Sequence, residues 1–296
     1  MIRYFIPFVL VLCVLASCEK DINIKLDKTS TDLVVDASIE NGQYPTVTLS
    51  RSLDYFSKID LQVLANSFVH NAIVTISNGQ LTAPLKEDST RDVTSGLVIY
   101  YYTFHSADGN LKFHGEFNSQ YNLEIQVENK TYTATTTIPN TNKYIDSLWW
   151  TPVTNTNDTG LVNLKAQFVD PPGLGNYTRY YTSVNNGPFY PGLNSVFDDQ
   201  ITDGTTYSIT IPKGVNRNFP IDGNNYGYFN RGDAIVVKLA NIDKATYDFW
   251  RTMEYNYSSV GNPFSSPTEV ISNISNGALG YFGGYAVQYK SISIPY

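Results

Sequence analysis

The chain has 296 residues, with 20 Lys or Arg against 27 Asp or Glu, and its formal net charge is -7 at pH 7. An acidic chain without a basic block repels phosphate backbones, so we expect no nucleic-acid partner. The 23 tyrosines, together with many Thr, Val and Ile residues, favour β-strands over helices.

The amino terminus has the pattern of a bacterial lipoprotein signal. Arg3 supplies a positive charge, and the apolar run 5–16 is shorter than the roughly 20 residues that cross a bilayer. Leu-Ala-Ser at 15–17 then precedes Cys18, as in the lipobox that lipoprotein signal peptidase cuts. We therefore predict a signal peptide at 1–17 and lipidation of Cys18. An ordinary secretory signal with a chance cysteine is the alternative.

Lipidation of Cys18 predicts where the protein is found. Two or more acyl chains hold a protein stably on a membrane without a spanning helix. Glu19 and Asp21 resemble the acidic export signal of Bacteroidota surface lipoproteins. We expect an outer-membrane protein, lipid-anchored and facing outward. Because Cys13 is removed with the signal peptide, the sequence excludes disulfides, zinc–thiolate sites and cysteine nucleophiles in the mature chain.

Short strands separated by turns are predicted for the first half of the mature chain. After a polar tether at 18–31, apolar and polar residues alternate as half-buried strands require. A hairpin at 98–117 is expected to turn at Asp108-Gly109, with Phe104 opposite Phe113 on the core face. The other strands are expected at 32–39, 45–51, 71–77, 80–85, 121–128 and 131–138. Together they predict an immunoglobulin- or transthyretin-like β-sandwich at 32–140.

A second β-rich domain with one packed α-helix is predicted at 141–296. Asp243 is a suitable helix N-cap, and the stripe 247–257 repeats aromatic and Met side chains at three- and four-residue steps. We expect this stripe to pack against the sheet. Long loops are predicted at 185–203 and 216–233. Strands are expected at 144–151, 161–169, 176–184, 205–211, 234–240 and 286–294, the last after a Gly- and Asn-rich stretch at 272–285.

Several blocks of sequence resemble one known family. They are residues 33–52, then 146–148, then DPPGLGNY at 170–177 and NISNGALGYFG at 273–283. In this order they are similar to the family catalogued as domain of unknown function 4249, from about residue 20 to the end. The resemblance implies a Bacteroidota cell-envelope lipoprotein, whose relatives are found near TonB-dependent outer-membrane transporters of the starch-utilisation type. It implies no catalytic residue.

Two groups of residues are candidates for metal binding. His105 and His114 share the solvent face of the predicted hairpin and, with Glu116, form a candidate transition-metal site; two exposed histidines are the simpler interpretation. The acidic loop 198–203 offers oxygen ligands for calcium, but it lacks the twelve-residue calcium-loop pattern. We predict no metal site and no cofactor.

The sequence also favours a protein that is not an enzyme. It has no Gly-x-Ser-x-Gly elbow, and no Gly-rich phosphate loop stands between a strand and a helix. A pair of carboxylates for glycoside cleavage is not excluded, because spacing in the sequence does not fix the distance between two carboxylates in space. We predict no catalytic residues, with a hydrolase as the weakest alternative.

Aromatic residues in the long connections of the second half are the better functional signal. Exposed rings give a large contact area at low entropy cost. The candidate binding residues are Phe189, Tyr190, Tyr226, Tyr228, Phe229 and Tyr255. We therefore predict a non-enzymatic surface lipoprotein that captures ligand for, or docks on, a TonB-dependent transporter. A structural or adhesive envelope protein is the alternative.

Overall fold

The computed structural model describes residues 31–53, 59–93, 95–105, 113–154, 158, 160–221, 226–259, 266 and 268–296. The predicted signal peptide, Cys18 and nearly all of the tether lie outside these residues. Asp32–Tyr296 group into one unit by their contacts.

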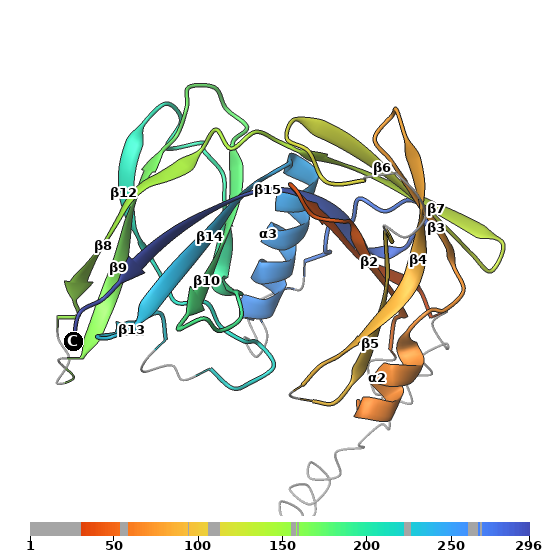
Figure 1. Cartoon of the computed structure of the whole chain (residues 1–296), viewed down its shortest axis with the longest axis horizontal. Helices are drawn as coiled ribbons and strands as arrows, with labels where there is room; N and C mark the ends of the chain where they lie inside the picture. The colour runs from red at the N-terminus through yellow and green to blue at the C-terminus, as the bar shows by residue number, and fades with distance from the viewer. Residues whose placement is uncertain are drawn as a thin grey trace, which may run out of the picture. The chain divides into compact units, whose positions relative to one another are not determined.

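The described residues confirm an all-β fold with a packed helix (Figure 1). The helices are α2 (Leu61–Ser67) and α3 (Lys244–Ser259). The strands are β1 (Leu33–Glu40), β2 (Thr46–Arg51), β3 (Ile73–Ser77), β4 (Thr82–Arg91), β5 (Val98–Thr103), β6 (Ser119–Val127), β7 (Lys130–Ile138), β8 (Tyr144–Pro152), β9 (Leu161–Val169), β10 (Tyr177–Val184), β11 (Tyr190–Phe197), β12 (Thr206–Ile211), β13 (Phe229–Asn230), β14 (Ala234–Ile242) and β15 (Leu279–Ser293). No helix among them is long and apolar enough to cross a membrane.

The strands form two sheets. One has 11 strands in the order β11-β10-β14-β15-β1-β2-β5-β4-β3-β6-β7, and in the other β9 pairs with β8, β12 and β13. The first strand and the last strand lie side by side in parallel, from Val34 opposite Leu279 to Glu40 opposite Tyr285. The large sheet therefore crosses the boundary predicted at 140/141.

Three clusters of buried side chains make up the core. The first lies mainly among β1 to β7, but Phe282 and Ala286 of β15 also belong to it. The second lies between the β9 sheet and strands β10 and β14. The third lies between α3 and the face of the large sheet formed by β10, β11, β14 and β15. Figure 1 shows α3 against this sheet. The cluster includes Tyr247 and Phe249. Strand β15 thus contributes to the core on both of its faces.

The hairpin predicted at 98–117 is wrong as a strand pairing. Strand β5 instead pairs with β4, with Val98 opposite Arg91. The sequence of the second half of β4, KEDSTR, is too polar to indicate a strand, although its backbone pairs fully. The expected turn at Asp108-Gly109 lies outside the described residues. Phe104 and Phe113 still meet in the core, with ring centroids 6.4 Å apart.

Three further elements differ from the predictions. The loop predicted at 185–203 contains β11, whose Pro and Gly residues disguise it, and the stretch 272–285 already includes the start of β15. Helix α2 was not predicted; Asp60 caps it by accepting a hydrogen bond from the backbone N–H of Val63 at 2.9 Å. The other predicted strands, and helix α3, overlap the observed ones.

Candidate functional site

A cavity of about 530 Å³ lies between α3 and the starts of β1 and β15. This volume is within the range of small-molecule sites, roughly 300–1,000 Å³. Its wall is mostly apolar and aromatic. Among the described residues that line it, Asp36 and Glu269 carry charge and no Lys, Arg or His is present. We call it the α3 cavity.

Strand β1 lines the cavity with the side chains on one of its two faces. Leu33, Val35, Ala37 and Ile39 are buried in the first core cluster. The positions between them point to the other face of the sheet, because successive strand side chains alternate. Val34 and Asp36 therefore line the cavity.

Helix α3 forms the opposite wall. Asp243 caps it by accepting from the Thr246 N–H at 2.8 Å. The same carboxylate accepts from the Thr137 N–H of β7 at 2.9 Å, which fixes the helix start to the sheet. The predicted stripe then divides in two. Tyr247 is buried in the third core cluster. Trp250 and Met253 pack against this cluster and also line the cavity, as Tyr257 does.

Gly280 allows β15 to approach β1 at the floor of the cavity. Its φ of +97° favours glycine, and a Cβ atom there would lie 1.9 Å from the Val35 carbonyl oxygen. Asn273 fixes the same stretch of strand, because its side chain accepts from the Phe282 N–H at 2.9 Å and donates to the Phe282 carbonyl at 2.8 Å. The Gly- and Asn-rich sequence is thus needed to build this floor.

A chain of hydrogen bonds runs from Trp250 to Tyr281, the neighbour of Asp36 on β15. The indole N–H of Trp250 donates to the Tyr285 hydroxyl at 3.0 Å. The Tyr285 hydroxyl donates to the Tyr281 hydroxyl at 3.2 Å, and Tyr281 lies opposite Asp36 in the pairing of β15 with β1. Burial raises the pKa of both tyrosines, so both stay protonated and can act as donors near neutral pH.

Asp36 combines exposure to the cavity with surroundings that are poor in water. Its side chain is exposed where it lines the cavity. The surrounding protein is nevertheless close enough that desolvation raises the pKa of Asp36. The neighbouring Tyr281 hydroxyl and the positive charge of Arg179 lower the pKa of Asp36 but do not cancel this effect. The ionised form of Asp36 is therefore only partly compensated by the protein itself.

Buried charges support the helix from behind Trp250. The guanidinium of Arg179 lies 3.4 Å from the Trp250 ring centroid, and its Nε donates to Ser195 Oγ at 3.0 Å. Glu254 of α3 accepts from the Ser195 N–H at 2.8 Å. Neither Arg179 nor Glu254 lines the cavity. This cluster holds α3 against β10 and β11 and so keeps the cavity wall in place.

The comparison with protein families identifies the chain. The model of a family described as a domain of unknown function, DUF4249, matches residues 19–291. The chain belongs to this family. The comparison with curated proteins gives no match.

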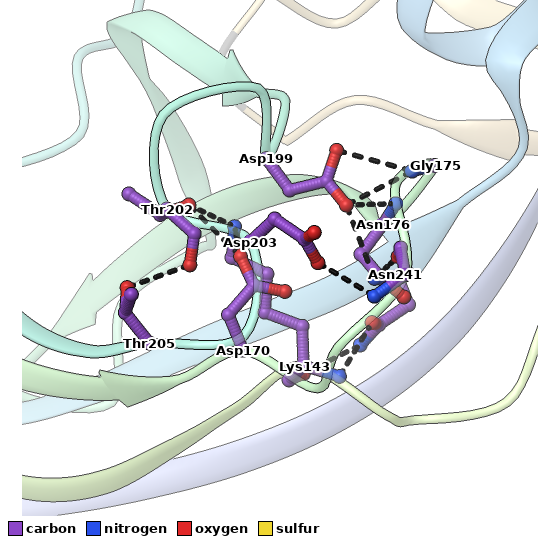
Figure 2. A network of polar contacts seen from close by, with 10 residues as sticks. Lys143, Asp170, Gly175, Asn176, Asp199, Thr202, Asp203, Thr205 and Asn241 are labelled. Atoms are coloured by element: carbon purple, nitrogen blue, oxygen red, sulfur yellow. Dashed lines mark hydrogen bonds and ion pairs between the residues drawn. The ribbon is translucent and has the colours of Figure 1, made fainter.

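Two of the blocks that resemble DUF4249 now have a structural explanation. NISNGALGYFG at 273–283 builds the cavity floor. DPPGLGNY at 170–177 is the centre of a polar network, in which Lys143 donates to Asp170 at 2.7 Å with both side chains fully buried (Figure 2). Asp199 accepts from the N–H groups of Gly175 and Asn176 at 2.9 and 2.8 Å (Figure 2). This network stabilises a turn, and its carboxylates are engaged within the protein.

The predicted aromatic residues of the DUF4249 chain do not meet in one site. Phe229 is fully buried, so it offers no surface to a ligand. Phe189 is 38 % exposed, and its ring packs 5.8 Å from that of Tyr289. Tyr190 belongs to β11 and accepts a hydrogen bond from Asn216. The other three are Tyr226 and Tyr228, both half-buried in the connection before β13, and Tyr255, exposed on α3.

The candidate metal residues are also separated. His105 lies 3.6 Å from Asp88, whereas the His114 ring stacks on Tyr44 at 4.7 Å. In the acidic loop, Asp199 and Asp203 accept backbone N–H groups. The described residues contain no group of three His, Cys, Asp or Glu side chains placed to hold a metal ion.

A larger hollow, of about 760 Å³, lies beside α2 and the β6–β7 turn. Its lining is more polar. Arg51 pairs with Glu128 at 2.6 Å, and His70 contacts Glu87, which lies outside the lining, at 2.5 Å. The α3 cavity is the better candidate because it is apolar and the Asp36 carboxylate that lines it is only partly compensated. Sequence reasoning found the stripe on α3 but missed Asp36 and Tyr281, which only the parallel β1–β15 pairing brings together.

Proposed function

We propose that this protein is a non-enzymatic lipoprotein of the outer-membrane surface that binds a small, largely apolar molecule in the α3 cavity. The observation that carries the proposal is the cavity itself: its volume of about 530 Å³ and its wall of apolar and aromatic side chains are those of a small-molecule site. We further propose that the protein presents this molecule to a TonB-dependent transporter.

The chemistry of the lining favours binding over catalysis. Phe249 and Tyr281 stack with ring centroids 4.4 Å apart and are 4 % and 6 % exposed, so they form a rigid inner wall. Leu279 and Tyr257 are about half exposed and lie where a ligand enters. A rigid apolar wall with few polar groups provides affinity and orientation, as small-molecule sites do.

Binding is tested with the full lipidated chain in phosphatidylcholine nanodiscs, with empty nanodiscs as the blank. The probe is tryptophol, a neutral water-soluble indole, followed by saturation-transfer NMR. Leu279→Trp narrows the cavity mouth from a position that is 47 % exposed, so the fold tolerates it, and we expect it to abolish the signal. Ile201→Trp, at a 95 % exposed site away from the cavity lining, is the matched control. Equal signals in both variants would refute binding in this cavity.

The membrane part of the proposal is supported by the lipobox at 15–18 and by the family match, which begins at residue 19, directly after Cys18. It is tested by fractionation and co-purification of the tagged protein. We expect the wild type in the outer membrane together with a TonB-dependent transporter, and Cys18→Ala outside the membrane fraction. A wild-type protein recovered without such a partner would contradict the accessory role and favour a structural or adhesive one.

A further inference from the structure

The charged residues that line the α3 cavity are both acidic. Asp36 lies at its floor and Glu269 lies in the exposed segment that follows α3. No cationic side chain belongs to the described lining.

Two guanidiniums lie behind the lining, Arg179 on Trp250 and Arg217 at 4.6 Å from the Tyr257 ring centroid. Both also lie within 4.0 Å of Glu254. The charged groups of the lining itself are acidic, which favours positively charged ligands over anions.

Among the described residues that line the cavity, none carries a positive charge to balance Asp36. Desolvation by the surrounding protein outweighs the effects of the neighbouring Tyr281 hydroxyl and the charge of Arg179, so the ionised carboxylate is destabilised. Arg179 is already engaged, since it stacks on Trp250 and bonds to Ser195. A cation placed in the cavity would supply the missing charge in a poorly hydrated setting, where ion pairing is stronger than in water.

The aromatic wall suits the same kind of ligand. Trp250, Tyr257, Tyr281 and Phe249 all line the cavity. Ring faces attract organic cations, and the attraction grows when water is excluded. These rings also bind the apolar body of a ligand, so a single molecule can use both properties.

We propose that the natural ligand of the α3 cavity is an organic amine, with a cationic ammonium group bound at Asp36 and an aromatic or aliphatic body held by the rings. This inference rests on the proposed function of the cavity as a binding site and names the chemical class of its ligand. Glu269 also lines the cavity and adds to its attraction for a cation.

Three indoles of similar size test the charge preference: tryptamine (cationic at pH 7), tryptophol (neutral) and indole-3-acetate (anionic). Their dissociation constants are measured with the full lipidated chain in nanodiscs, with empty nanodiscs as the blank. We expect tryptamine to bind at least about tenfold more tightly than tryptophol, and indole-3-acetate to bind most weakly. This comparison needs no variant of the protein.

Asp36→Asn then assigns the preference to one residue. We expect it to reduce the tryptamine-to-tryptophol ratio to about threefold or less while tryptophol binding persists, which also shows that the variant is folded. Glu40→Gln is the matched control, because Glu40 is on the same strand face but pairs with Lys238 outside the cavity. It should keep the wild-type ratio.

Two results would overturn the inference, and they are distinct from failure of the proposed function. Equal affinity for tryptamine and tryptophol, or an unchanged ratio in Asp36→Asn, contradicts the amine while leaving a neutral binding site. If none of the three indoles binds, or if Leu279→Trp does not alter their binding, the cavity is not the binding site and both proposals fail.

Discussion

Removing Lys143 should destabilise the protein strongly, because it leaves a buried charge without its partner. Lys143 and Asp170 are both fully buried, and Nζ lies 2.7 Å from Asp170 Oδ2 (Figure 2). After Lys143→Met, the Thr202 hydroxyl at 2.8 Å would remain as the side-chain partner of Oδ2, whereas Oδ1 already has no hydrogen-bond partner among the described residues. Breaking a buried pair in this way costs about 3–5 kcal/mol.

The assay is urea unfolding followed by tryptophan fluorescence, with the midpoint and slope compared between variants. Lys244→Met is the matched control: its ion pair with Asp248 has an Nζ–Oδ2 distance of 2.5 Å, but Lys244 is 66 % exposed. An exposed pair four residues apart on a helix contributes about 0.2–0.5 kcal/mol. The double variant Lys143→Met with Asp170→Leu removes the unpaired charge and should recover most of the loss. A loss below about 1 kcal/mol in Lys143→Met, or no recovery in the double variant, would refute the reasoning.

Three further outcomes are expected. Gly280→Ala should lower the free energy of unfolding in urea by about 2–4 kcal/mol, because backbone strain at φ +97° adds to the steric clash with Val35. Gly277→Ala is the control: its φ is +74° but the space around it is open, so the loss should be about 1 kcal/mol. Equal losses in the two variants would contradict the close approach of β15 to β1. For Asp199, desolvation is outweighed by N–H donors from Asn176 and Gly175, which lower its pKa. Its stabilisation is therefore complete above the ordinary pKa of 3.8 and is lost as pH falls through the lowered value, so Asp199→Asn should flatten the acid limb of a stability–pH curve. Tyr190→Ala should leave the tryptophol affinity within about twofold of the wild-type value, since Tyr190 does not line the α3 cavity. A larger change would indicate that the ligand binds at the aromatic loops instead.

The sequence predicts the fold class well because its strongest patterns are local. The alternation of apolar residues in β1 and the aromatic stripe on α3 predict which face of each element is buried, and the structure has both elements. Prediction fails where local pattern and pairing disagree. The second half of β4 is polar yet fully paired, and β11 begins with Pro and Gly residues at its second and third positions.

The candidate site was predicted only in part, for a different reason. Its walls come from segments about 210–250 residues apart in the chain, and the parallel pairing of β1 with β15 is what joins them. Asp36 is an ordinary polar position on an amphipathic strand when the sequence is considered alone. Its importance depends on Tyr281 beside it and on α3 above it, and no spacing rule contains that information.

The most direct test of binding in the α3 cavity is photoaffinity mapping with a diazirine-bearing indole on the full lipidated chain. We expect crosslinked peptides from two segments, 249–257 of α3 and 279–281 of β15, and loss of both labels in Leu279→Trp. Labelling concentrated at Phe189, Tyr190 or Tyr226, or labelling that Leu279→Trp leaves unchanged, would contradict a ligand site between α3 and the β1–β15 pair.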